Sequence, residues 1–152
     1  MKTIDGVTIY ERELNHKLST EIYEEFREFI QEQQCYKNIY YVLSQCIHKF
    51  KEQGWKIGYG YFSDVNEHYF RHCYIIDEQG TVIDPTYMLF NHSVSTKSPV
   101  YWTFTSLDVN EYLALVEKYD NTPSLLKHYE SIHRTLFSWG LKQKPQLAFW
   151  DY

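Results

Sequence analysis

The sequence predicts an α+β fold in which a central helix packs on an antiparallel sheet, with additional helices toward the C-terminus. Three observations lead to this class: an apolar stripe with helical spacing across residues 36–53, a strand–turn–strand pattern across residues 71–84, and two helical patterns after residue 106. A chain of 152 residues is long enough to bury one core, so we expect residues 1–152 to form a single domain.

The chain before the central helix contains two expected elements. Residues 4–12 form either a short strand or an arm. Ser19 and Thr20 then offer an N-cap for an acidic helix that we expect to extend to about residue 32. The apolar face expected for this helix is made of Ile22, Phe26, Phe29 and Ile30.

The central helix is expected over residues 36–53. Gly54 ends it, and two lysines lie in the final turns, where cations suit the helix dipole. The apolar stripe consists of Ile39, Val42, Leu43, Cys46, Ile47 and Phe50. If residues 31–34 form a loop, Cys35 lies at the first turn, where free N–H groups and the dipole favour a reactive thiolate. If one helix instead continues through this region, Cys35 lies mid-helix and that activation is lost.

The register of the β-hairpin that follows decides whether His72 and Asp84 lie within reach of each other. Two strand-like stretches, the second β-branched, flank a turn that ends at Gly80. A three-residue loop pairs Asp77 with Thr81 and places His72 diagonally across from Asp84. A loop one residue earlier places them directly opposite, and both registers put them on one face, whereas a two-residue loop does not. The position of Gly80 favours the three-residue loop.

These elements suggest a catalytic triad of Cys35, His72 and Asp84. The cysteine would be the nucleophile, the histidine the base, and the aspartate would fix the tautomer of the imidazole and stabilise its cation. Taken alone, His72 and Asp84 are better explained as a structural cross-strand pair. When the cysteine segment is added, the catalytic triad becomes the better explanation. Cys46 and Cys73 are expected to be small buried hydrophobic residues.

Composition excludes several other classes of function. A net charge of −5 gives no nucleic-acid footprint, and no apolar run is long enough to span a membrane. Three cysteines do not suggest a disulfide framework, and residues 1–6 lack an apolar signal core, so we expect a cytoplasmic protein. The spacing of cysteines and histidines fits no metal site, and no motif for a cofactor is present.

The chain beyond the hairpin predicts a long irregular stretch, a strand and two helices. Residues 87–99 are rich in Ser and Asn and form a possible rim of the site, and residues 100–105 read as a strand. Ser106 or Asp108 caps a helix to about Tyr119, and a second helix covers residues 123–139. The tail at 142–152 carries three aromatic residues that we expect to fold back on the domain or to meet a partner.

Three motifs carry a resemblance to a known family. They are Gln34-Cys35-Tyr36-Lys37-Asn38 at a helix start, His72-Cys73-Tyr74-Ile75-Ile76-Asp77 on a strand, and Gly80-Thr81-Val82-Ile83-Asp84-Pro85-Thr86 on the next. With the strand at 58–61, they resemble small bacterial and phage members of the papain-like / transglutaminase-like cysteine fold. The similarity covers about residues 34–87, and Tyr74 stands where such proteins often carry Trp.

The resemblance implies acyl chemistry without a cofactor, such as that of a cysteine protease-like hydrolase, a deamidase or a transglutaminase-like enzyme. Hydrolysis or transfer at an amide or thioester would proceed through an acyl-cysteine, and the substrate would be a peptide, a glutamine side chain or a small acyl or amide compound. Gln34, Tyr36 and Asn38 are the candidate substrate- or oxyanion-binding residues. The alternative is an inactive binding or inhibitor module on the same fold, which would act on a protein partner.

Overall fold

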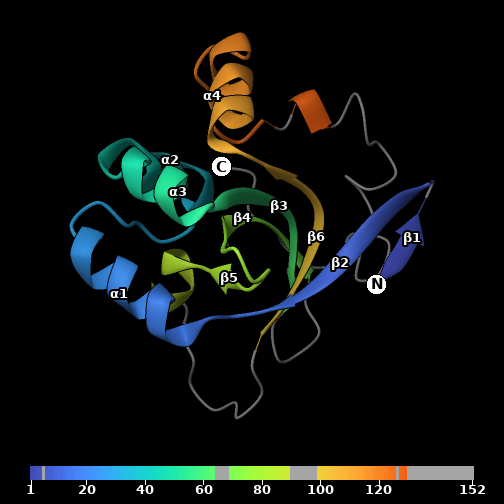
Figure 1. Ribbon diagram of the computed structural model, residues 1–152, viewed down its shortest axis with the longest axis horizontal. Coiled ribbons are helices and arrows are strands. Elements are labelled where there is room, and N and C mark those ends of the chain that lie inside the picture. The colour runs from blue at the N-terminus through green and yellow to red at the C-terminus, as the bar shows by residue number, and fades with distance from the viewer. Residues whose placement is uncertain (5, 64–68, 90–98, 126, 130–152) are drawn as a thin grey trace.

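The computed structural model describes residues 1–4, 6–63, 69–89, 99–125 and 127–129, which form an α+β fold (Figure 1). In this part of the chain, a six-stranded antiparallel sheet has the order β1-β2-β6-β3-β4-β5. The strands are β1 (Lys2–Ile4), β2 (Val7–Glu13), β3 (Lys56–Ser63), β4 (Tyr69–Ile76), β5 (Val82–Ile83) and β6 (Val100–Leu107). The helices are α1 (His16–Phe26), α2 (Cys35–Gln45), α3 (Ile47–Gln53), α4 (Val109–Lys118) and the short 3-10 helix η1 (Pro85–Leu89).

The N-terminal part differs from the expected strand and helix in its boundaries. The expected strand or arm at residues 4–12 belongs to the hairpin of β1 and β2. Helix α1 begins at His16 rather than at residue 20, because the Asn15 side chain accepts a hydrogen bond from the Leu18 N–H at 3.0 Å and so caps it earlier. It also ends at Phe26, six residues before the expected end.

The expected central helix is divided into α2 and α3 at Cys46. The backbone there has φ −139° and ψ 43°, so the helix cannot continue straight. The Cys46 thiol donates to the Val42 carbonyl at 3.0 Å, and the change of direction lets α3 bury Phe50 against Trp55 with the rings 5.4 Å apart. The prediction of one helix over residues 36–53 is therefore wrong at this residue, while the end at Gly54 is confirmed.

Two apolar cores lie on opposite faces of a strongly curled sheet. Helices α2 and α3 cover one face, and the larger core lies beneath them (Figure 1). The second core fills the inside of the curl and consists of Phe62, Tyr74, Ile76, Val82 and Tyr101. The chain after β2 closes the curl, because Leu14 bridges to Val82 and the Asn15 N–H donates to the Val82 carbonyl at 2.7 Å.

The helix expected after residue 106 is α4. Asp108 caps it, and Glu111 completes a capping box by accepting from the Asp108 N–H. Of the second expected helix, at 123–139, only residues 123–125 and 127–129 are described. The tail at 142–152 lies outside the described residues, as do residues 64–68 and residues 90–98 of the expected irregular stretch. Among the helices that are described, none is long and apolar enough to cross a membrane.

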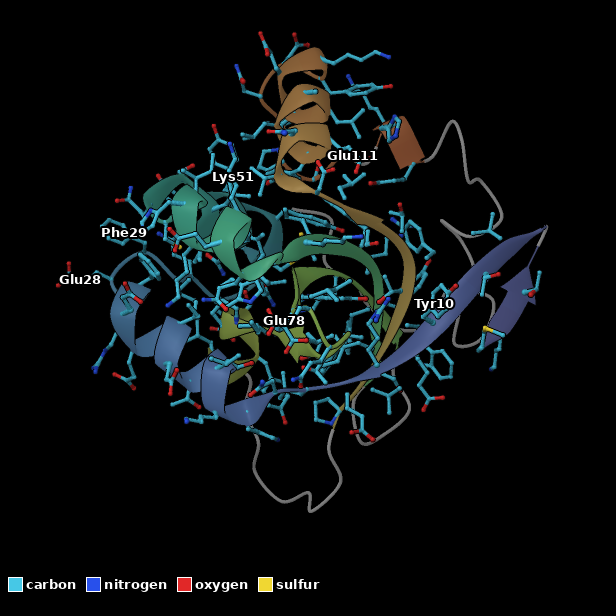
Figure 2. The ribbon with its side chains drawn as sticks, viewed as in Figure 1. Tyr10, Glu28, Phe29, Lys51, Glu78 and Glu111 are labelled. Atoms are coloured by element: carbon cyan, nitrogen blue, oxygen red, sulfur yellow. The ribbon has the colours of Figure 1, made fainter. Side chains whose placement is uncertain are left out.

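Charged side chains lie on the outside of this arrangement. Figure 2 labels Glu28, Lys51 and Glu111, which are exposed and extend away from the elements that carry them. The ionisable groups considered below are instead buried.

Candidate active site

The hairpin of β4 and β5 has the expected three-residue loop. The Asp77 N–H donates to the Thr81 carbonyl at 2.9 Å, and Ile75 and Ile76 pair with Ile83 and Val82. Gly80 has φ +83°, the left-handed conformation that glycine adopts without strain. Residue 74 therefore faces residue 84, and His72 is diagonal to Asp84 on the same face, as the sequence predicted.

His72 and Asp84 form a fully buried pair. The distance between His72 Nε2 and Asp84 Oδ2 is 2.6 Å, and both side chains are 0% exposed. Because an ionised carboxylate can only accept hydrogen bonds, Nε2 carries the proton and Nδ1 is the ring nitrogen left for another partner. The aspartate thus fixes the tautomer of the imidazole.

Cys35 is the first residue of α2 and lies close enough to His72 to influence its charge state. The preceding segment is a loop, with Gln33 at φ +57°, so the alternative of one continuous helix is excluded. The first N–H groups of a helix have no intrahelical acceptor, and its positive dipole end favours an anion at this position. Cys35 thus lies at the end of α2 where the free N–H groups and the helix dipole favour a negative charge.

The electrostatics of His72 favour its cation. Burial alone would lower its pKa, but the negative charge of Asp84, the interaction with Cys35 and the hydrogen bond to Asp84 raise the pKa of His72 to about 10. An imidazolium in contact with a thiol stabilises the thiolate form. The three residues together can therefore supply a nucleophile, a proton donor and a group that orients the donor.

Asp84 is held by residues that the sequence did not identify as its partners. The Tyr101 hydroxyl donates to Asp84 Oδ2 at 2.8 Å, and the backbone N–H groups of Thr86 and Tyr87 donate to Oδ1 at 3.1 and 3.3 Å. The Ser19 hydroxyl accepts from the backbone N–H of Asp84 at 2.9 Å. The carboxylate thus has four donors, counting His72, and its position is fixed from α1, β6 and η1.

A second polar network supports the strands behind this pair. The Tyr74 hydroxyl and the Thr103 hydroxyl lie 2.7 Å apart, and Arg12 Nε donates to the Thr103 oxygen at 3.0 Å. Arg12 also donates to the Gly80 carbonyl at 3.0 Å, which links β2 to the turn of the hairpin. The network links β2, β6 and the hairpin of β4 and β5 to one another.

The three candidate substrate- or oxyanion-binding residues have different surroundings. Asn38 donates to the Gln31 carbonyl at 2.8 Å and to the Thr86 hydroxyl at 2.9 Å, so both of its amide hydrogens are used within the protein. Its contacts fix the loop before Cys35, and we do not retain it as an oxyanion donor. Gln34 lies at the N-cap of α2, and its side-chain oxygen is buried and accepts no hydrogen bond from a described residue. Tyr36 stacks on Tyr59 with the ring centroids 6.0 Å apart.

A small pocket of about 10 Å³, roughly enough for one water molecule, includes His72 in its lining. Its described lining residues are Tyr36, Tyr59, Gly60, Tyr61, Arg71, His72, Phe104, Ser124 and Tyr129. Cys35 is not among these lining residues and is 0% exposed, and His72 as a whole residue is 1% exposed. The pair is therefore closed to bulk water in this conformation, with the pocket as the adjoining space.

Cys46 and Cys73 are buried free cysteines, as expected. Burial raises the pKa of both thiols, which keeps them in the less reactive neutral form. Among the described residues, no group of three His, Cys, Asp or Glu side chains is placed to hold a metal ion.

Comparison with known proteins gives no relative from which a role could be transferred. No protein-family model, curated protein or solved structure matches the chain.

Replacing Tyr101 with phenylalanine tests the support of Asp84. The change keeps the ring but removes one donor from a buried carboxylate, and we expect the free energy of unfolding to fall by about 1.5–3 kcal/mol. Urea unfolding measures it, with Tyr10→Phe as the control at a tyrosine that is 48% exposed. Equal stabilities of the Tyr101 variant and the control would contradict the role given to this hydroxyl.

The raised pKa of His72 predicts a contribution to stability that depends on pH. The folded state binds the proton more tightly than the unfolded state, whose histidine has a pKa of about 6.5. The contribution is therefore complete below about pH 6.5 and is lost as the pH rises through about 10. Unfolding measured across this range should show a steeper decline for the native protein than for His72→Gln, and parallel curves would refute the assignment.

Proposed function

We propose that this protein is a cysteine-dependent enzyme of acyl transfer or hydrolysis, built on a papain-like / transglutaminase-like core. The observation that supports this best is the buried His72–Asp84 hydrogen bond, together with the position of Cys35 at the first residue of α2 and within electrostatic reach of His72. The combination of nucleophile, base and orienting carboxylate is the arrangement that nucleophilic catalysis by a thiol needs.

In the proposed reaction, the Cys35 thiolate attacks a carbonyl carbon and a C–S bond forms. The N–H groups at the start of α2, with the Gln34 amide beside them, stabilise the oxyanion. The bond to the leaving amine or thiol then breaks, and His72 gives that group its proton. Water or an amine next attacks the acyl-cysteine and loses a proton to His72, which releases the acyl group and restores the thiolate–imidazolium pair.

Acylation of Cys35 by a small activated ester, p-nitrophenyl acetate, tests this proposal. We expect mass spectrometry of the intact protein and its digest to locate an acetyl group on Cys35, with release of p-nitrophenol. His72→Ala should slow the acylation at least about tenfold, since it removes the imidazolium that stabilises the thiolate. Acetylation at surface lysines alone, unchanged in His72→Ala, would contradict the proposal.

A binding module on the same core is the second candidate. The observation that favours it is the complete burial of Cys35, which leaves the thiol without direct contact with solvent. On this alternative, the triad is only a structural polar cluster, and Cys35 reacts slowly with every reagent in both the native protein and His72→Ala.

A further inference from the structure

Asn38 joins α2 to two other parts of the chain. Its side-chain oxygen accepts from the Gln31 N–H at 3.0 Å, and its amide nitrogen donates to the Gln31 carbonyl at 2.8 Å and to the Thr86 hydroxyl at 2.9 Å. The residue is 1% exposed, and hydrogen bonds in such a site are stronger than those in water. Because these contacts use the oxygen and both hydrogens of the amide, the side chain is held in one orientation.

Thr86 is the partner of Asn38 in the contact that leaves the helix. It lies in η1, two residues after Asp84, and is 0% exposed. Its backbone N–H donates to Asp84 Oδ1 at 3.1 Å, and the other oxygen of that carboxylate lies 2.6 Å from His72 Nε2. Thr86 therefore contacts the carboxylate through its backbone and α2 through its hydroxyl.

A continuous path of bonds thus joins the start of α2 to the buried His72–Asp84 pair. Cys35 and Asn38 lie three residues apart in the first turn of α2, and the Asn38 N–H donates to the Gln34 carbonyl at 2.8 Å. A regular helical turn fixes the position of one residue relative to the other. The contact between Asn38 and Thr86 spans 48 residues of sequence, so it holds α2 against the turn after β5.

The separation of Cys35 and His72 determines how strongly an imidazolium stabilises a thiolate. The energy of two opposite charges falls as their distance grows, and it is largest where water is excluded. Both residues are buried. Helix α2 positions Cys35, whereas β4 and the Asp84 carboxylate position His72. A contact that fixes α2 relative to Asp84 therefore fixes this separation as well.

We propose that Thr86 is a positioning residue of the candidate site. Its hydroxyl, acting through Asn38, holds the start of α2 at the distance from His72 at which the Cys35 thiolate forms. The inference rests on the proposed function, because it assumes that His72 stabilises this thiolate. Loss of the hydroxyl should then weaken the thiolate even though the nucleophile, the base and the carboxylate are all present.

Replacing Thr86 with valine removes the hydroxyl and keeps a branched side chain. The quantity to measure is the midpoint of the pH profile of Cys35 alkylation by iodoacetamide, with Cys46 and Cys73 replaced by alanine. This midpoint reports the ionisation of the thiol and does not depend on how readily the reagent reaches the sulfur. We expect Thr86→Val to raise it by about one pH unit or more, toward the ordinary thiol value of about 8.5. Thr86→Ser, which keeps the hydroxyl, should retain the native midpoint.

Thr103→Val is the matched control for a purely structural loss. The Thr103 hydroxyl is also buried and hydrogen-bonded, but its partners, Tyr74 and Arg12, lie on β4 and β2 rather than on α2. This variant should lose stability in urea and keep the native midpoint. Equal midpoints in Thr86→Val and Thr103→Val, beside a raised midpoint in His72→Ala, would overturn this inference and leave the proposed function intact. A midpoint that is unaffected by His72→Ala would overturn both.

Hydrogen exchange in the unmodified chain covers the case in which Thr86→Val does not fold. The Gln31 N–H is bonded to Asn38 and the Thr86 N–H to Asp84, at the two ends of the path. If the Thr86 hydroxyl joins these ends, both amides should exchange through one opening with the same dependence on urea. Two openings with different dependence on urea would show that the loop before Cys35 moves independently of the Asp84 turn, and would overturn the inference.

Discussion

Replacement of Asp84 with alanine is expected to destabilise the folded protein by about 3–5 kcal/mol, the range for removing one member of a buried ionic pair. The carboxylate is 0% exposed and accepts from His72, Tyr101 and two backbone N–H groups. All four donors would lose their acceptor in an apolar surrounding, and the His72 cation would lose its counter-charge. For a chain of this length, the melting temperature should fall by about 6–20 °C.

Thermal unfolding of Asp84→Ala and Asp84→Asn, side by side, measures this effect. Asparagine keeps the size of the side chain and one oxygen acceptor, so its loss of stability should be smaller than that of alanine, although it also removes the charge. A loss of less than about 1 kcal/mol in Asp84→Ala, no more than an ordinary substitution, would contradict the picture of a carboxylate with four donors.

Substitution of Gly60 by alanine is expected to cost about 3 kcal/mol or more, above the usual range for overpacking. Gly60 lies opposite His72 at a bulge between β3 and β6. A Cβ atom there would collide with the backbone carbonyl of Trp102, which cannot turn aside as a side chain can. The strands would have to separate directly next to the candidate site.

Gly58→Ala is the matched control on the same strand. Its Cβ would approach the ends of the Ile76 and Tyr74 side chains at 2.7 Å, which can shift at less cost. Urea unfolding should therefore rank the two variants with Gly60→Ala clearly less stable. The opposite order, or equal losses, would show that the contact between β3 and β6 is less tight than described.

Local sequence information was sufficient for the hairpin and therefore for two residues of the candidate site. The position of Gly80 selected the loop length, and the alternation of side chains in the strands then put His72 and Asp84 on one face. Asp77 strengthens this choice, because its carboxylate accepts from the N–H groups of Gln79 and Thr81, each at 2.9 Å. Because these hydrogen bonds form within the turn itself, few other turn conformations compete with this one.

The start of α2 was left open because two neighbouring helical patterns gave no breaker between them. The loop before Cys35 depends on a contact within the fold: Asn38 binds both the backbone N–H and the carbonyl of Gln31. A side chain inside a helix thus fixes the loop that precedes the helix. The sequence suggested Asn38 as a site residue, and its contacts give it this structural role instead.

The partners of Asp84 could not be predicted because they come from distant parts of the chain. Ser19 is 65 residues away and was expected to be a helix cap, whereas it is buried inside α1. Tyr101 is one of 15 tyrosines, and its position depends on the order of the strands, which periodicity does not give. The break at Cys46 likewise follows from how α3 packs.

We propose that His72 holds Cys35 as a reactive thiolate. The pH dependence of Cys35 alkylation by iodoacetamide, in the native protein and in His72→Ala, tests it most directly, with Cys46 and Cys73 replaced by alanine in both. Because the sulfur is buried, alkylation is slow in both proteins. The comparison therefore uses the shape of the pH profile and the ratio of the two alkylation rates. We predict a native rate that persists below about pH 7 and falls at least about tenfold in His72→Ala. Identical profiles, each following an ordinary thiol with a pKa of about 8.5, would contradict the account.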